Sequence, residues 1–86
     1  MKHVAIPRFW KAYENLPVDI QKLADEHFSI LKSNPSYPSL HFKKIDRFWS
    51  VRIGLHWRAL AIEDDATCIW FWIGSHAEYD RLLKLT

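Results

Sequence analysis

The spacing of apolar residues divides the chain into a helical first third and a strand-rich remainder. Between residues 7 and 33, apolar side chains recur every three or four positions, which is the period of an amphipathic helix. This stripe comprises Phe9, Trp10, Ala12, Tyr13, Leu16, Ile20, Leu23, Ala24, His27, Phe28 and Leu31. Pro7 and Pro17 suit the first turns of two helices, and Asn34 with the proline after it ends the second. The pattern predicts a helical hairpin, preceded by a short edge strand over residues 3–6.

From residue 41 onward the hydrophobic period changes to two, which is the period of a β-strand. The alternation predicts strands over residues 41–45, 49–53, 56–63 and 67–73. The last of these is apolar on both faces, as is typical of a strand that is covered on both sides of a sheet. Because the helical hairpin can cover only one face, we expect the last helix or another chain to cover the other.

A third helix is predicted to begin at Ser75, where the segment S-H-A-E has the spacing of a capping box. Its apolar positions are Tyr79, Leu82, Leu83 and Leu85. Together these elements predict an α+β fold, with an N-terminal helical hairpin packed on a twisted, mainly antiparallel sheet of about four strands and a short C-terminal helix. No repeat or linker divides the sequence, so we expect residues 1–86 to form a single domain.

The chain is rich in bulky apolar residues for its size. Of its 86 residues, 49% are hydrophobic and 15% are aromatic, and five are tryptophans. A domain this small buries only about 60% of its unfolded surface, so we expect part of the apolar excess to form a partner surface. The formal charge of +2 neither requires nor excludes nucleic acid as a partner.

Cysteine usage and hydropathy predict the compartment. The single Cys68 excludes an internal disulfide and suits a reducing environment. The start, M-K-H-V-A-I-P-R, lacks the apolar region of a signal peptide, and the longest apolar run, residues 68–73, is too short to span a bilayer. We therefore expect a cytoplasmic protein without membrane contact.

Two arginines in neighbouring strands form a candidate phosphate site. Arg58 lies inside an apolar strand, where an unpaired charge is costly to bury. Its partner could be Glu63, Asp46 or Asp80, or it could face solvent, or it could clamp a phosphate. Arg52 lies in the preceding strand, and two arginines that meet across a sheet repel each other unless an anion bridges them.

The third helix supplies two further candidates. His76 lies in its first turn, where the helix dipole and free amide groups favour an anion, and an imidazole beside a phosphate suits general acid–base chemistry. Tyr79 lies one turn later on the same face. The alternatives are that His76 merely begins the helix and that Tyr79 is a core residue with a solvated hydroxyl.

Two lysines are candidates for binding a phosphate backbone, but metal chemistry is not indicated. Lys43 and Lys44 point to opposite sides of their strand, so only one of them can face the site. The histidines are scattered without metal-binding spacing. They are His3, His27, His41, His56 and His76. We expect no metal ion and no cofactor.

Several segments carry a resemblance to a known family. They are S-L-H-F-K-K, S-V-R-I-G-L-H-W-R-A-L and I-W-F-W-I-G-S-H-A-E-Y-D-R-L-L, and they follow a helical hairpin with L-P between its helices. In this combination and order the chain resembles the RelE/ParE superfamily of bacterial type II toxins. The resemblance covers nearly the whole chain.

The RelE-like branch of this superfamily implies a ribosome-dependent endoribonuclease that cuts messenger RNA without a metal and so inhibits translation. In that reaction the 2′-hydroxyl of one nucleotide attacks the adjacent phosphate and leaves a cyclic phosphate. Arg58 would stabilise the developing charge, and His76 and Tyr79 would share the proton transfers. The residues that would bind the RNA are Lys43, Lys44 and Arg52.

The resemblance also implies partners and leaves alternatives. The partners would be the ribosome, messenger RNA and a cognate antitoxin, whose disordered or helical segment wraps the apolar surface. Without the antitoxin we expect a sticky protein or a homodimer. The ParE-like branch inhibits DNA gyrase instead, and inactive relatives that bind RNA or protein also occur. No carboxylate clearly matches the base that some members use, and Asp46 is one candidate for it.

Overall fold

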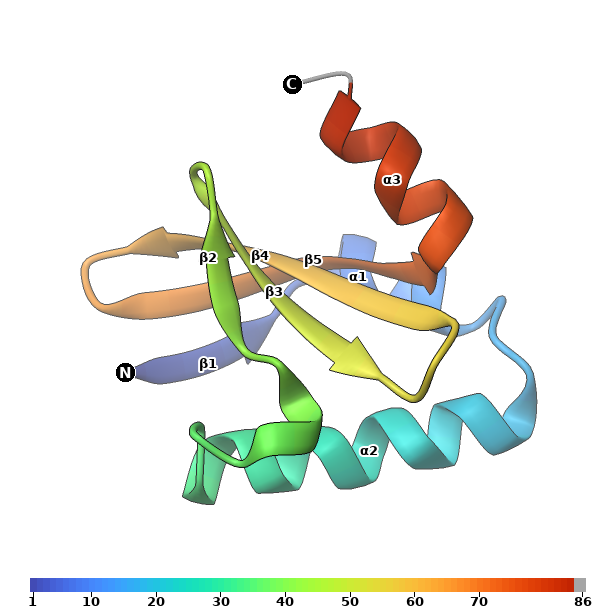
Figure 1. Ribbon diagram of the computed structural model, residues 1–86, viewed down its shortest axis with the longest axis horizontal. Coiled ribbons are helices and arrows are strands. Elements are labelled where there is room, and N and C mark those ends of the chain that lie inside the picture. The colour runs from blue at the N-terminus through green and yellow to red at the C-terminus, as the bar shows by residue number, and fades with distance from the viewer. Residues whose placement is uncertain (85–86) are drawn as a thin grey trace.

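The computed structural model describes residues 1–84, which form the helices and strands drawn in Figure 1. In chain order the elements are β1 (Lys2–Ala5), α1 (Pro7–Tyr13), α2 (Val18–Ser33), the 3-10 turn η1 (Pro38–Leu40), β2 (Lys43–Ile45), β3 (Phe48–Ile53), β4 (Trp57–Asp64), β5 (Thr67–Ser75) and α3 (His76–Lys84). The predicted helical hairpin and C-terminal helix are confirmed. Leu85, a predicted apolar position of the last helix, lies outside the described residues.

The strands form one sheet in the order β1-β5-β4-β3-β2. The pairs β2–β3, β3–β4 and β4–β5 are antiparallel, whereas β1 runs parallel to β5 at the edge. The sheet is therefore mainly antiparallel, as predicted, but in the described part of the chain it has five strands rather than about four. The fifth strand is the N-terminal edge segment, predicted over residues 3–6 and observed at Lys2–Ala5, which pairs with residues 67–70 far along the chain.

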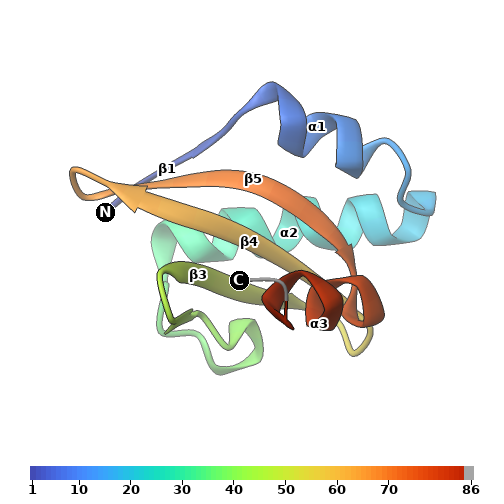
Figure 2. The ribbon, with the colours of Figure 1, turned by 90° about the horizontal axis from the view of Figure 1, so that it is seen from above.

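Different helices cover the two faces of the sheet (Figures 1 and 2). α1 and α2 lie on one face, and their apolar residues join the larger core, which contains the buried Leu31 and Trp70. α3 packs on the other face, where Tyr79 forms a smaller cluster with Phe48 and Leu60. The last helix thus covers the second face, which is one of the two outcomes that the apolar strand allowed.

An irregularity in β5 sets the direction of its last residues. The register with β4 shifts next to Leu60, and Phe71 is the extra residue of this β-bulge. Beyond the bulge, Gly74 is the partner of Arg58. A Cβ at Gly74 would overlap the indole ring of Trp72, so the glycine is needed for that ring to fold back along the strand.

The longest helix, α2, has 16 residues and one apolar stripe, as expected for a helix at the surface of a domain. It follows Pro17, carries Asp19 in its first turn and ends before Asn34. In the part of the chain that the structure describes, no helix is both long and apolar enough to cross a membrane.

Candidate functional site

A polar pocket opens where β3 and β4 meet the first turn of α3. Its volume is about 120 Å³, and it is lined by His41, Lys43, Ser50, Arg52, Arg58, His76 and Tyr79. All of the predicted site residues except Lys44 therefore surround one hollow. The lining contains cationic and titratable side chains but no carboxylate, so the pocket favours an anion.

Arg52 and Arg58 face each other across the β3–β4 pair. The chain reverses direction after Gly54, whose φ of 64° lies in the left-handed region that favours glycine. This reversal sets the register in which Arg52 and Arg58 are direct partners. Directly opposed residues of two paired strands project from the same face. Two positive charges are consequently held side by side at the pocket.

Backbone carbonyls hold both guanidinium groups. Arg52 Nε donates to the Gly54 carbonyl at 3.0 Å, and Arg58 Nη1 donates to the Trp57 carbonyl at 2.8 Å. Within residues 1–84 neither arginine forms an ion pair with a carboxylate. Of the partners considered for Arg58, the carboxylates Glu63, Asp46 and Asp80 therefore form no ion pair with it in the described structure.

The electrostatic environment of Arg58 reflects the opposed arrangement. Burial, and after it the positive charge of Arg52, lower the pKa of Arg58 below its usual value, while Tyr79 and Asp80 act in the opposite direction. An anion bound between the two guanidinium groups would offset their repulsion. Guanidinium groups bind phosphate oxygens through paired hydrogen bonds, so a phosphate fits this requirement.

The start of α3 forms one side of the pocket. The Glu78 amide donates to Ser75 Oγ at 3.2 Å, and Ser75 Oγ in turn donates to Glu78 Oε1 at 3.2 Å, which satisfies the predicted capping box in part. The His76 amide donates to the His56 carbonyl at 2.7 Å. These two amides are already bonded and are therefore not free for a phosphate. Side chains that line the pocket supply the other hydrogen-bond donors.

The imidazole of His76 lies between Tyr79 and Asp80. Its ring stacks on the Tyr79 ring with a centroid distance of 5.9 Å, and its Nε2 is 3.6 Å from Asp80 Oδ1. The Tyr79 side chain is buried, and its hydroxyl lies 3.0 Å from Ser50 Oγ at the pocket. Tyr79 is therefore a core residue, as one interpretation predicted, and its hydroxyl also lies at the pocket, as the other predicted. No group of three or more potential metal ligands occurs within residues 1–84.

The two neighbouring lysines lie on opposite faces of the sheet, as predicted. Lys43 is the partner of Ser50 and lines the pocket. Lys44 is the partner of Trp49, and its Nζ lies 3.9 Å from Glu63 Oε1. Lys44 is therefore outside the pocket, and of the two lysines only Lys43 can contact an anion bound there.

The pocket also contains His41 and Ser50, which are not among the predicted site residues. The expected strand over residues 41–45 is shorter in the structure, because His41 follows η1 with a left-handed φ of 44° and the strand begins at Lys43. His41 Nε2 lies 3.5 Å from Arg52 Nη1. Ser50 could have been found, because it alternates with Arg52 along one face of β3. Asp46, the candidate carboxylate, does not line the pocket.

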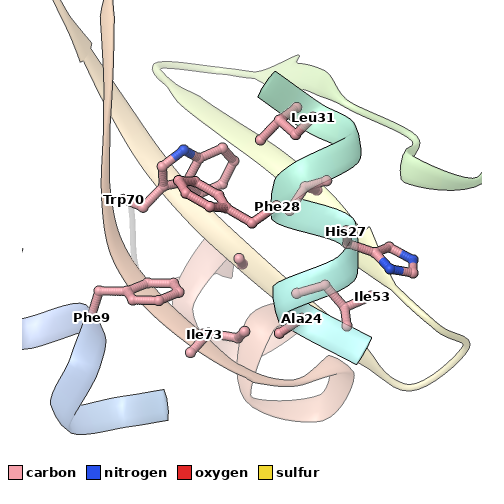
Figure 3. Close-up of a pocket in the computed structure, with 10 residues that line it drawn as sticks. Phe9, Ala24, His27, Phe28, Leu31, Ile53, Trp70 and Ile73 are labelled. Atoms are coloured by element: carbon pink, nitrogen blue, oxygen red, sulfur yellow. The ribbon is translucent and has the colours of Figure 1, made fainter. Parts of the chain in front are cut away.

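A second, apolar hollow lies inside the larger core (Figure 3). Its volume is about 30 Å³, and its lining includes Phe9, Phe28 and Trp70. The ring of His27, at its edge, points away from the other side chains in Figure 3, and His27 Nδ1 is bonded to the Leu23 carbonyl at 2.9 Å. This hollow is packing space rather than a site for polar chemistry.

Comparison with known proteins assigns the family. The family model of the ParE-like toxin domain matches residues 18–81, which run from the start of α2 into α3 and include every residue that lines the polar pocket. This chain belongs to that family and is a toxin of the RelE/ParE superfamily. A search of curated proteins finds no match.

Solved structures agree with this assignment at the level of the fold. The RelB-RelE antitoxin-toxin complex of Methanococcus jannaschii has a chain that is similar with a TM-score of 0.70 and 20% identity, over 91% of this chain and 96% of that one. The RelBE2 toxin-antitoxin complex of Mycobacterium tuberculosis has a TM-score of 0.65 at 19% identity, over 87% and 96%. The isolated RelE toxin of E. coli has a TM-score of 0.62 at 8% identity, over 99% and 98%.

Proposed function

We propose that this toxin acts in the cytoplasm as a metal-independent, ribosome-dependent endoribonuclease that cuts messenger RNA and so inhibits translation. The observation that carries the proposal is the direct opposition of Arg52 and Arg58 beside His76 in one pocket. A phosphate is the ligand that this charge arrangement favours, and an imidazole next to a bound phosphodiester can move a proton.

The proposed chemistry is a transesterification within the RNA. The 2′-oxygen of one nucleotide attacks the adjacent phosphorus, and the bond to the 5′-oxygen of the next nucleotide breaks, which leaves a 2′,3′-cyclic phosphate and a free 5′-hydroxyl. Arg58 donates hydrogen bonds to the phosphoryl oxygens as their charge increases. Arg52 and Lys43 bind the RNA backbone on the side of β3 and β2. Lys44, on the other face, makes no direct contact in this proposal.

His76 carries a proton transfer in this mechanism, and Tyr79 supports it. The stacked Tyr79 ring fixes the plane of the imidazole, while its hydroxyl, paired with Ser50, offers a hydrogen bond to the substrate from inside the pocket. This arrangement places an imidazole, which can accept or donate a proton, next to the arginine that binds the phosphate.

A cognate antitoxin is the proposed binding partner. Two of the structurally similar chains come from toxin-antitoxin complexes, and large hydrophobic side chains remain exposed in the free chain. They include Val4, Trp10, Val18, Leu55 and Ile62. An acidic segment with apolar anchors would cover such residues and neutralise the pocket. Without that partner we propose that the free toxin self-associates, as a homodimer or larger species.

Inhibition of DNA gyrase is the second candidate function, and the match to the ParE-like family model favours it. Gyrase inhibition requires no RNA cleavage, so purified components can separate the two functions. The wild-type protein is incubated in one assay with ribosomes programmed with a defined messenger RNA, and in another with gyrase and relaxed plasmid.

The nuclease proposal predicts cuts in the ribosome-bound RNA and unchanged supercoiling. Arg58→Ala should lower the cleavage rate by about 100-fold or more, because a preorganised donor to the developing charge is lost. Lys44→Ala is the matched control and should cut at the wild-type rate. Block of supercoiling with intact RNA would favour the gyrase inhibitor. Intact RNA and normal supercoiling together would indicate a relative that only binds.

A further inference from the structure

The proposed cleavage needs two proton transfers, and His76 accounts for one of them. A base must remove the proton of the attacking 2′-hydroxyl, and an acid must protonate the leaving 5′-oxygen. His76 can perform one of these steps in a single turnover. The assignment of the second group rests on the proposed nuclease function, and that group must lie among the side chains that line the pocket.

Two of these lining side chains, His41 and His76, are imidazoles, the side chain that enzymes use most often as a general acid or base. The Tyr79 hydroxyl is in addition engaged by Ser50 Oγ at 3.0 Å. The pocket lining therefore offers a pair of imidazoles for a pair of proton transfers.

The sheet order places these imidazoles at opposite ends of the arginine pair. His76 directly follows β5, Arg58 lies on β4, Arg52 lies on β3, and His41 precedes β2 with its Nε2 3.5 Å from Arg52 Nη1. A phosphate bound between the two arginines would thus have one histidine on each side. Displacement at phosphorus needs this arrangement, because the attacking and leaving oxygens lie on opposite sides of the phosphorus.

The charges around each ring differ and suggest the direction of transfer. His41 lies beside Arg52, which can only donate hydrogen bonds, and beside Lys43, so the contact with Arg52 requires an unprotonated Nε2. A phosphate that draws Arg52 toward itself would release that lone pair. His76 Nε2 lies 3.6 Å from Asp80 Oδ1, a contact that becomes an ion pair when the ring carries a proton.

We infer that His41 is the general base and His76 the general acid of this toxin. His41 Nε2 takes the proton of the 2′-hydroxyl while the bond from the 2′-oxygen to phosphorus forms. The bond from phosphorus to the 5′-oxygen breaks, and His76 gives its proton to that oxygen. His41 then loses a proton to water and His76 regains one. Arg58, Tyr79 and Asp80 surround His76 throughout, and Arg52 and Lys43 surround His41.

The backbone at His41 is consistent with a dedicated role. Its φ of 44° and ψ of 43° place it in the left-handed region, which costs energy for a residue with a Cβ. The conformation follows η1 and turns the chain into β2, so the ring is presented at the pocket by a strained but anchored position. Asparagine tolerates this conformation better than most residues, which makes His41→Asn a variant that should fold but cannot take the proton.

The test uses purified full-length protein on ribosomes programmed with synthetic messenger RNA. One RNA has the ordinary scissile linkage, and a second has sulfur in place of the bridging 5′-oxygen, because a thiolate leaves without a general acid. His41→Asn should lose about 100-fold or more in cleavage rate on both RNAs. His76→Asn should lose as much on the ordinary RNA and should regain most of its rate on the sulfur-containing one.

The pH dependence and substrate binding give independent readouts. Wild type should show a bell-shaped rate profile, His41→Asn should lack the fall toward low pH, and His76→Asn should lack the fall toward high pH. Each variant should bind a 2′-deoxy, uncleavable RNA on the ribosome as wild type does, which separates chemistry from folding and affinity.

The outcomes distinguish this inference from the proposed function. If wild type cuts and His41→Asn cuts at a similar rate, the inference is overturned and the nuclease proposal stands. Relief of the His41→Asn defect by the sulfur-containing RNA would also overturn it, since His41 would then be the acid. If wild type leaves both RNAs intact on the ribosome, the nuclease proposal fails and the assignment of His41 fails with it.

Discussion

Single side chains in the pocket are organised around one unfavourable contact, the pair of opposed arginines. Arg52 and Arg58 are cross-strand partners, and hydrogen bonds to backbone carbonyls hold them without a neutralising carboxylate within residues 1–84. Proteins retain such repulsion where an anion is to be bound, because the free energy it stores is released on binding. The pair is therefore the residue-scale signature of a site that is complete only with its ligand.

A double-mutant cycle with Arg52→Ala and Arg58→Ala should reveal this repulsion directly. Like charges directly opposite in a sheet destabilise it, so we expect an unfavourable coupling of roughly 0.2–1 kcal/mol in the free energy of unfolding. Urea denaturation of wild type, both single variants and the double variant measures it. Added inorganic phosphate should shrink the coupling. A coupling of zero or of attractive sign would contradict the arrangement described.

At the scale of elements, the alternation along the strands predicted which side chains share a face, but the turns between elements place the remaining side chains of the pocket. The alternation along β2 correctly separated Lys43 from Lys44, because a strand sends successive side chains to opposite faces. The same rule paired Ser50 with the face of Arg52. The strand predicted over residues 41–45 put His41 on the same face as Lys43, but β2 begins only at Lys43. The place of the His41 ring at the pocket depends on the left-handed turn after η1, which no alternation predicts.

The cap of α3 is the element-scale feature that orients His76. Ser75→Ala removes both the acceptor of the Glu78 amide and the donor to the Glu78 carboxylate, and it should destabilise the domain by about 1 kcal/mol. Urea denaturation measures this loss. The matched control is Ser33→Ala at the exposed end of α2, where the hydroxyl bonds only to the Ser29 and Ile30 carbonyls of its own helix. Equal losses for the two variants would show that the Ser75 cap contributes nothing specific.

At the scale of the whole molecule, the α+β class and the covering of both sheet faces were predictable, but the pairing of the first strand with the last was not. β1 pairs in parallel with β5 across most of the chain, and no local pattern specifies a partner at such a separation. One contact beneath that pairing helps to fix it. The Trp70 indole donates to His3 Nδ1 at 3.1 Å, within an aromatic cluster that includes Phe28 and Phe42.

The burial of His3 in this cluster predicts how stability depends on pH. Burial, the N-terminal charge and Lys32 lower the pKa of His3 below its usual value of 6.5. The unfolded chain therefore binds a proton more readily than the folded one, so the stabilisation is fully present above about pH 6.5 and is lost as pH falls through the folded pKa. Urea denaturation at pH 7.5 and pH 5 should show a smaller pH effect in His3→Gln than in wild type.

The exposed His56 supplies the comparison for this experiment, since its side chain lies in the β3–β4 turn. His56→Gln should keep the wild-type loss of stability at low pH. If His3→Gln and His56→Gln respond to pH in the same way, the burial of His3 does not contribute to the acid sensitivity.

His76 and Tyr79 lie in α3, after the last strand, and this position determines when the pocket can form during synthesis of the chain. Two of the seven residues that line the pocket, His76 and Tyr79, follow β4 and β5 in the chain, and β1 stays without its partner until β5 has been made. A nascent chain that has not yet passed residue 79 lacks an intact pocket. The pocket can therefore bind an anion only after β5 and the first turns of α3 have been synthesised and have folded.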